Sequence, residues 1–179
     1  MIFQREHCKL IAKGKKTQTR RLVKEGDYSL KYVRWKDLKK GVPISSIAKY
    51  AVFRKNGKIR WVVGRDYSVQ DGRGKYCLTY CENCKAIIED PHTWYSCCPI
   101  CGWSRWKSYN GYETNEPPFK PLKIKIKSIK KERLFDISRK DAKKEGGYTP
   151  KEFIKMFQKL YKKPESWNPE LWVLEFELL

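Results

Sequence analysis

The chain lacks the long apolar run that a membrane-spanning helix needs, and its first residues are polar and charged. Arg5, Glu6 and His7 stand where the apolar part of a signal peptide would lie. We therefore expect a cytoplasmic protein that has no membrane partner. Internal repeats, coiled-coil heptads and long disordered tails are absent from the sequence as well. At 179 residues the chain can bury one substantial core, or a small domain with an added module.

Acidic residues are scarce: 20 Asp and Glu stand against 40 Lys and Arg, which gives a formal net charge of +20. Such a charge favours a polyanionic partner, and we expect this partner to be nucleic acid, with RNA favoured over DNA. The charge is unevenly distributed. Residues 1–75 carry 21 Lys and Arg against 6 Asp and Glu, residues 120–179 carry 16 against 9, and residues 76–119 carry 3 against 5. The central segment is therefore expected to be an insertion in a basic domain.

The central segment also holds six of the seven cysteines. An odd number of cysteines in a reducing compartment argues against a disulfide framework. Cys81 and Cys84 form one C-x2-C knuckle, and Cys98 and Cys101 form a second one thirteen residues further on. Four thiolates at this spacing complete a tetrahedron around Zn²⁺. The sequence therefore predicts a structural zinc ribbon within residues 76–119.

Alternatives remain for the metal and for its ligands. An iron site of the rubredoxin type would use the same four thiolates, and Cys97 or Cys77 could replace one of them at a different spacing. A site of four thiolates is closed to water and substrate, so the metal would stabilise the insertion rather than react. Aromatic residues crowd around the knuckles and would form the core of the ribbon, although a base-stacking surface is the alternative. These residues are Trp94, Tyr95, Trp103, Trp106, Tyr109 and Tyr112.

A dense group of cations and hydroxyls occupies residues 14–21. Gly14 can end a helix with a positive φ, and Thr17 and Thr19 favour an extended strand. The segment is therefore expected to run from a helix through a tight turn into a strand. Its ammonium, guanidinium and hydroxyl donors are suited to phosphate or a nucleobase. A solvated edge strand, protected by lysines from aggregation, is the alternative.

Local signals predict the other elements. Asn56 and Gly57, placed between two apolar runs, predict a hairpin of residues 47–53 and 59–63. Ser138 and Thr149 each begin a capping pattern, so two helices are expected after them. Apolar residues alternate with lysines over residues 122–127, which predicts a half-buried strand. A closing strand is expected at residues 171–179, with four alternate side chains facing inward: Trp172, Leu174, Phe176 and Leu178.

Several of these segments, taken in order, resemble the ASCH family, which belongs to the PUA-like superfold. Residues 14–21 resemble the opening signature of the family, and residues 67–75 resemble its central Gly-Arg-Gly-Lys stretch. Short motifs from residue 133 to residue 178 then follow in the family's order. The resemblance covers residues 1–75 and 120–179. It implies an α+β fold, a PUA-like mixed β-barrel with flanking helices, into which the zinc ribbon is inserted.

Some members of the ASCH family are amidohydrolases that act on N4-acetylcytidine. The resemblance places their catalytic lysine, threonine and glutamate at Lys16, Thr19 and Glu145. A lysine desolvated in a cavity can lose its proton near neutral pH and activate a threonine hydroxyl, while a carboxyl group shuttles protons. Strict strand alternation would place Lys16 and Thr19 on opposite faces, so their joint action requires a bend after Gly14.

The resemblance also implies a cleft that binds RNA between barrel and helix. Five cations would contact phosphate there: Lys15, Arg20, Arg21, Arg73 and Lys75. We expect a nucleic-acid-binding protein, and hydrolysis of N4-acetylcytidine or of RNA is the alternative function. A protein-binding adaptor is a third class, but it would leave the charge outside the insertion without a role. A deep pocket that brings Lys16, Thr19 and Glu145 together would favour the enzyme.

Overall fold

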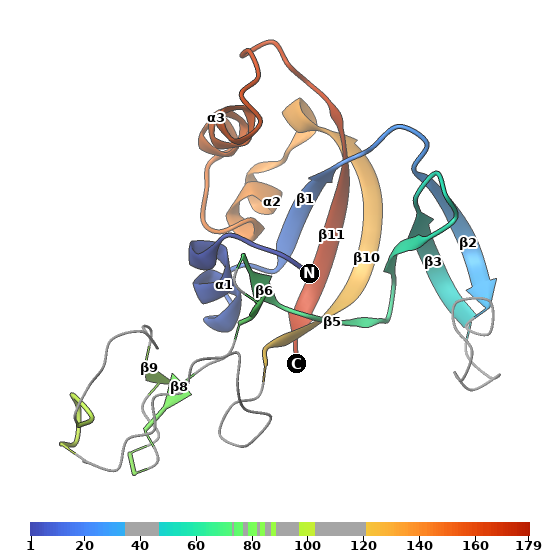
Figure 1. Ribbon diagram of the computed structural model, residues 1–179. Coiled ribbons are helices and arrows are strands. Elements are labelled where there is room, and N and C mark those ends of the chain that lie inside the picture. The colour runs from blue at the N-terminus through green and yellow to red at the C-terminus, as the bar shows by residue number, and fades with distance from the viewer. Residues whose placement is uncertain are drawn as a thin grey trace.

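The computed structural model describes residues 1–34, 47–72, 74–76, 79–81, 83–84, 87–88, 97–102 and 121–179, which form an α+β structure with antiparallel sheets and few helices (Figure 1). The main sheet has the order β1-β11-β10-β5, with bounds Gln18–Leu22, Glu170–Leu178, Lys123–Arg133 and Asp66–Ser68. A second sheet has the order β2-β3-β4, with bounds Tyr28–Arg34, Ile47–Phe53 and Ile59–Val62. Two short ladders pair β6 with β7 and β8 with β9, with bounds Gln70–Asp71, Gly74–Lys75, Thr79–Tyr80 and Ile87–Ile88.

The helices begin at the capping residues that the sequence predicts. In α2 (Arg139–Lys144), the Ser138 hydroxyl accepts a hydrogen bond from the Asp141 N–H at 3.0 Å. In α3 (Pro150–Leu160), Thr149 and Glu152 form a complete capping box, and proline occupies the first turn. The other helices are α1 (Arg5–Ala12) and the short 3-10 helix η2 (Leu134–Asp136). Both predicted helix starts are confirmed.

The hairpin and the strand after the insertion are also confirmed. Strands β3 and β4 pair in antiparallel fashion on either side of Gly57, whose φ is +71°. In β10, Ile124 and Ile126 are fully buried and alternate with lysines. A bulge between Ile126 and Ser128 shifts the register of β10 against β11. These elements give the main sheet its long antiparallel centre.

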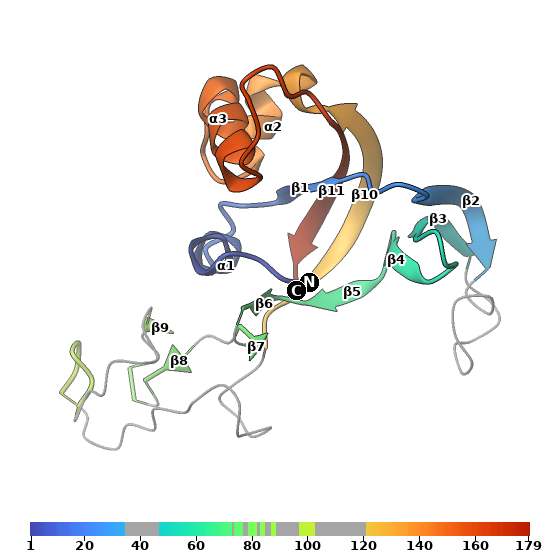
Figure 2. The same cartoon turned by 45° about the horizontal axis from the view of Figure 1, so that its top comes forward.

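Strand β11 is the predicted closing strand, but its expected one-sided alternation is wrong. All four residues from Leu171 to Leu174 are buried, whereas Leu178 is 39% exposed. The reason is that both faces of the sheet are covered. Leu171 packs with the α2–α3 cluster, while Trp172 and Leu174 pack with side chains of β3 and β4 (Figures 1 and 2). Strand β11 is therefore central in the sheet, not at its border.

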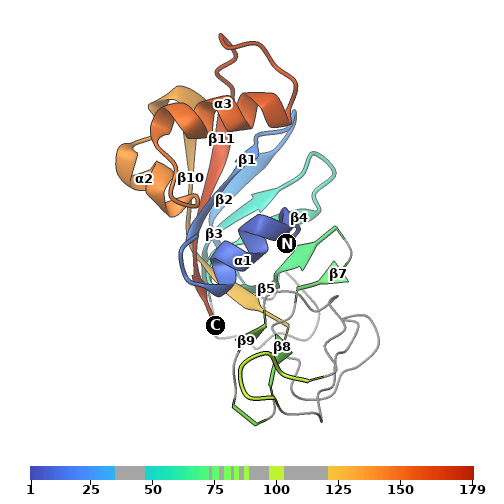
Figure 3. The same cartoon turned by 90° about the vertical axis from the view of Figure 1, so that its left-hand side faces the viewer.

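The expected closed barrel is not what the described residues form. Their strand pairing leaves the β1-β11-β10-β5 sheet and the β2-β3-β4 sheet as separate sheets. The main sheet stays open at β1, where the side chains of Thr19 and Arg21 line a cavity beside α3 (Figure 3). Barrel closure depends on pairing between strands that are distant in sequence, which local patterns do not encode.

The insertion leaves and rejoins the main sheet at neighbouring points. The N–H of Leu122 donates to the carbonyl of Tyr76 at 3.0 Å, and the N–H of Tyr76 donates to the carbonyl of Val69 at 2.9 Å. Both Tyr76 and Leu122 are buried with α1 residues in one cluster. The chain between these two anchors therefore begins and ends at the same edge of the core.

Candidate functional site

The segment from Gly14 to Thr17 connects α1 to β1 and carries Lys16. Gly14 has a φ of +67°, and the N–H groups of Lys15 and Lys16 donate to the Leu10 carbonyl at 2.8 and 3.1 Å. The N–H of Thr17 donates to the Lys144 carbonyl at 3.0 Å, which ties the segment to the end of α2. Because β1 begins only at Gln18, Lys16 is not subject to strand alternation. The bend that joint action with Thr19 requires is therefore present.

Lys16 and Glu145 form a buried ion pair. Lys16 Nζ lies 2.7 Å from Glu145 Oε2 and 2.6 Å from the Glu145 carbonyl oxygen, and each residue is only 2% exposed. Glu145 is the C-terminal cap of α2, so the helix end positions both acceptors. Burial lowers the pKa of Lys16, and the neighbouring Glu145 carboxylate opposes this shift. The lysine is therefore closer to losing its proton than an exposed lysine is.

Arg20 holds the other oxygen of the same carboxylate. Its Nη1 donates to Glu145 Oε1 at 3.0 Å, and its Nη2 donates to Glu132 Oε1 at 2.8 Å. Nη1 also donates to Gln18 Oε1 at 3.0 Å, and Asp141 lies 3.8 Å from Nη2. The Arg20 side chain is fully buried in this network. Its role as a surface phosphate ligand, expected from the sequence, does not fit this position.

A cavity opens beside this network and brings the three expected catalytic residues together. We call it the Lys16 cavity; it contains about 450 Å³ of space, part of it open to solvent. Its polar lining includes Lys16, Thr19, Arg21 and Glu145, and Thr19 is 5% exposed. Aromatic rings line the remaining wall, and three of them come from α3 and its C-terminal end: Phe153, Phe157 and Tyr161. The arrangement offers an apolar slot with convergent polar groups.

Two features of the cavity were not found from the sequence. His7 of α1 lines it, and burial together with the charge of Lys16 lowers the pKa of His7 to about 4. Arg20 Nε is buried and has no hydrogen-bond partner among the described residues. The helical spacing of His7 and Ile11 on α1 could have indicated that His7 faces the core side. The environment of Arg20 depends on acids from distant segments and carried no local signal.

The other expected phosphate ligands have different environments. Lys15 is exposed, and Arg21 lies with its guanidinium over the Phe3 ring, 5.1 Å from the ring centre. Arg21 also donates to the Ile2 carbonyl. Arg73 and the side chain of Lys75 lie outside the described residues. Lys15 and Arg21 thus lie at or near the Lys16 cavity, with Lys15 open to solvent.

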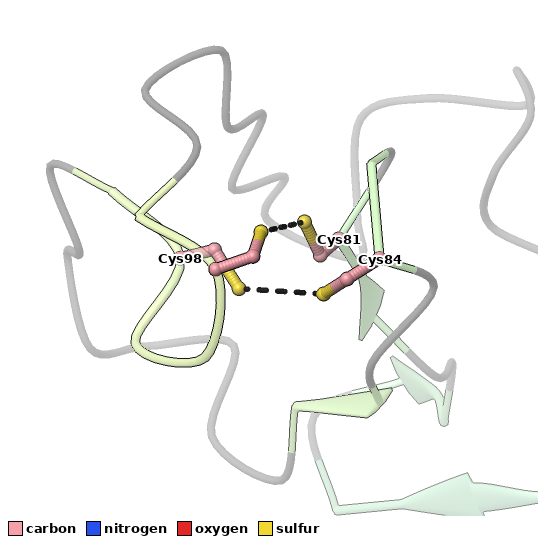
Figure 4. Close-up of side chains that lie close together, drawn as sticks. Cys81, Cys84 and Cys98 are labelled. Atoms are coloured by element: carbon pink, nitrogen blue, oxygen red, sulfur yellow. Dashed lines mark hydrogen bonds between the residues drawn. The ribbon is translucent and has the colours of Figure 1, made fainter.

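Four cysteines converge in the insertion and form a set that could hold a metal ion. The sulfur atoms of Cys81, Cys84, Cys98 and Cys101 all lie within 4.8 Å of one another. The Cys81–Cys101 and Cys84–Cys98 sulfur separations are 3.6 and 3.8 Å (Figure 4). Tetrahedral zinc with Zn–S bonds of about 2.3 Å would place its sulfurs about 3.8 Å apart.

The backbone of the second knuckle supports this geometry. Gly102 has a φ of +66°, its N–H donates to the Cys98 carbonyl at 2.9 Å, and the N–H of Ile100 points to Cys98 Sγ at 3.5 Å. Cys97 is exposed and is not part of the cluster. Cys77 and the expected aromatic core of the ribbon lie outside the described residues.

Comparison with models of known protein families, with curated proteins and with solved structures found no match. Among the helices that the structure describes, none is long and apolar enough to cross a membrane.

Proposed function

We propose that the chain is a hydrolase that removes the acetyl group of N4-acetylcytidine in the Lys16 cavity. The observation that carries this proposal is the buried contact of 2.7 Å between Lys16 Nζ and Glu145 Oε2, in a cavity that Thr19 also lines. A lysine, a threonine and a glutamate are the residues that the resemblance to ASCH amidohydrolases implies. Burying an ion pair costs free energy, so its presence in an open cavity favours a chemical role over a structural one.

The reaction can be written with these residues alone. The neutral amine of Lys16 accepts the proton of the Thr19 hydroxyl while Thr19 Oγ1 attacks the acetyl carbonyl carbon. Lys16 then gives this proton to the departing N4 nitrogen, which releases cytidine and leaves an acetyl ester on Thr19. A water molecule, deprotonated by Lys16, attacks the ester and restores the Thr19 hydroxyl as acetate leaves. Glu145 stabilises the ammonium form of Lys16 in both steps.

The rest of the cavity suits this substrate. Phe153, Phe157 and Tyr161 provide an aromatic wall against which a pyrimidine ring can stack. The buried Nε of Arg20 needs an acceptor, and an oxygen atom of the substrate would supply one. His7 stays neutral above pH 5 because of its lowered pKa, so it adds a hydrogen-bond donor and acceptor without a charge.

Conversion of N4-acetylcytidine to cytidine and acetate tests the proposal. Lys16→Ala and Thr19→Val should each lower kcat by at least about a hundredfold, because each removes a group that forms or transfers a bond. Lys15→Ala is the matched control, since Lys15 is the exposed neighbour of Lys16 and should keep its activity. Equal loss in Lys15→Ala and Lys16→Ala, or no conversion by the wild type, would contradict the proposal.

We further propose that the four thiols hold a structural zinc ion within an ASCH-type, PUA-like chain. The sulfur separations of 3.6 and 3.8 Å support zinc, and four thiolates leave no open position for a substrate. The zinc would therefore order the insertion and take no part in hydrolysis.

Nucleic-acid binding is a second candidate function, favoured by the charge of +20 and by the exposed Lys15 beside the cavity. Binding of this kind should weaken steeply with salt. Fluorescence anisotropy with a labelled RNA strand measures it, and affinity that does not change with salt would count against this function.

A further inference from the structure

A second cavity lies between the turn that connects β1 to β2 and the turn that connects β3 to β4. We call it the Arg60 cavity; it contains about 680 Å³ of space, part of it open to solvent. Four cations line it against two carboxylates: Lys24, Arg54, Lys55, Arg60, Glu25 and Asp27. The hydrolytic reaction uses none of these residues.

One of the two carboxylates is already neutralised inside the protein. Asp27 Oδ2 accepts hydrogen bonds from the N–H of Lys24 at 3.0 Å and from Trp172 Nε1 at 3.3 Å, and it forms a close ion pair with Arg60. In the described part of the chain, no ion pair joins Lys24, Arg54 or Lys55 to an acid. The cavity therefore presents several cations whose charge is not cancelled by a neighbour.

The two turns are packed closely enough to hold these cations in place. Gly26 has a φ of +76°, and a Cβ atom there would lie only 2.7 Å from Lys55 Cβ. The stem of Lys55 therefore crosses directly over the glycine, which no other residue could replace without displacing it. Hydrogen bonds of 2.9 Å from Asp27 N to the Lys24 carbonyl and of 2.8 Å from Gly57 N to the Arg54 carbonyl close the turns.

Strand β1 connects the Arg60 cavity to the Lys16 cavity. Arg60 donates to the Leu22 carbonyl at 3.2 Å, at the end of β1, and its guanidinium lies over Trp61 at 4.1 Å. Arg21, one residue earlier, lines the Lys16 cavity, and Arg60 is near enough to lower its pKa. From Thr19 to Leu22 the strand advances about 10 Å. A strand of a few nucleotides can span such a distance.

We propose that the Arg60 cavity binds the phosphate groups of an RNA strand whose acetylated cytosine occupies the Lys16 cavity. The substrate would then be an acetylated RNA rather than a free nucleoside. The assignment of the substrate depends on the proposed hydrolase function, whereas phosphate binding in the Arg60 cavity does not. Exposed cations give affinity for the backbone without reading its sequence, so the acetyl group and the base supply the selectivity.

The test compares free N4-acetylcytidine with a short single-stranded RNA that carries one central N4-acetylcytidine. The wild type should hydrolyse the RNA with the higher kcat/KM. The double variant Arg54→Ala/Lys55→Ala should lower kcat/KM on the RNA about tenfold at low salt and leave the free nucleoside unaffected. Its plot of log(kcat/KM) against log salt should be flatter by about 1.4, which is about 0.7 for each phosphate contact on a single strand.

The double variant Lys123→Ala/Lys127→Ala is the matched control, because it removes the same charge from exposed positions of β10. Equal losses on the RNA in both double variants would overturn the proposal, as would equal kcat/KM for nucleoside and RNA in the wild type. If the wild type hydrolyses neither substrate, the hydrolase function fails, and anisotropy with the unmodified RNA then tests the Arg60 cavity alone. A greater loss of affinity in Arg54→Ala/Lys55→Ala than in the control supports it, and an equal loss refutes it.

Discussion

Replacing Glu145 by Gln keeps the shape of the side chain and removes the charge that Lys16 and Arg20 share. Lys16 Nζ lies 2.7 Å from the carboxylate, and water is almost excluded from both side chains. Arg20 keeps its ion pair with Glu132 in the variant. The change therefore acts mainly on Lys16, which keeps the Glu145 carbonyl as an acceptor but loses its counter-ion.

The magnitude follows from the two states open to Lys16. Removing one partner of a buried ion pair costs about 3–5 kcal/mol when the other stays charged. Loss of the Lys16 proton limits this cost to about 4.6 kcal/mol at pH 7 and to about 1.9 kcal/mol at pH 9, for an unfolded pKa of about 10.4. We therefore expect Glu145→Gln to lower the free energy of unfolding by about 3–5 kcal/mol at pH 7 and by less than about 2 kcal/mol at pH 9.

The sign of the pH dependence follows from proton linkage. Without the carboxylate, the folded pKa of Lys16 falls further below its unfolded value, because burial already lowers it. Between these two pKa values the unfolded chain binds more protons, so the stability of the variant rises with pH. The gap to the wild type should close as pH increases.

Urea unfolding followed by circular dichroism at pH 7, 8 and 9 measures this gap. Glu175→Gln is the control, because Glu175 pairs with Lys144 at a partly exposed position and should contribute less than about 1 kcal/mol. A loss below about 1 kcal/mol for Glu145→Gln, with no change across the pH range, would refute the reasoning. It would mean that Glu145 does not hold Lys16 as a buried cation.

Three further expectations concern the cavity, the metal and a helix. The rate on N4-acetylcytidine should rise with pH to a midpoint below about 10.4, without a step near 6.5, because burial lowers the pKa of both Lys16 and His7; initial rates at several pH values check this. The purified chain should contain about one zinc ion by elemental analysis, and chelation should make four further thiols reactive. Thr149→Ala removes the capping box of α3 and should lower Tm by about 2–4 °C in a thermal scan, whereas an unchanged Tm would contradict a stabilising cap.

Elements with a strong local signal could be predicted from the sequence. The capping box at Thr149 and the turn at Gly57 depend on residues that are adjacent in the chain, and both are present. The closing strand was only partly predicted. Its alternation fails at Leu171 and Val173 because helices cover a face that the pattern assigned to solvent. Which strands pair, and whether they close a barrel, depends on such long-range packing.

The candidate site shows the same division. Lys16, Thr19 and Glu145 were named from the sequence because they stand in short recognisable motifs, and the structure brings them to one cavity. The position of Arg20 was misjudged, because Glu132 is more than a hundred residues away and nothing near Arg20 indicates that it is buried. A basic motif alone does not separate internal cations from those that face solvent.

The hydrogen bond between Leu122 and Tyr76 makes residues 77–121 a closed loop as far as the main sheet is concerned. The free energy of closing a flexible loop changes by only about 0.6 kcal/mol when its length doubles. The ribbon can therefore lose its metal, grow, or be exchanged for a short connection with little effect on the fold around Lys16. Mutations in the ribbon and mutations in the cavity are then free to accumulate independently, so that a new partner can be acquired at one end of the molecule without altering the chemistry at the other.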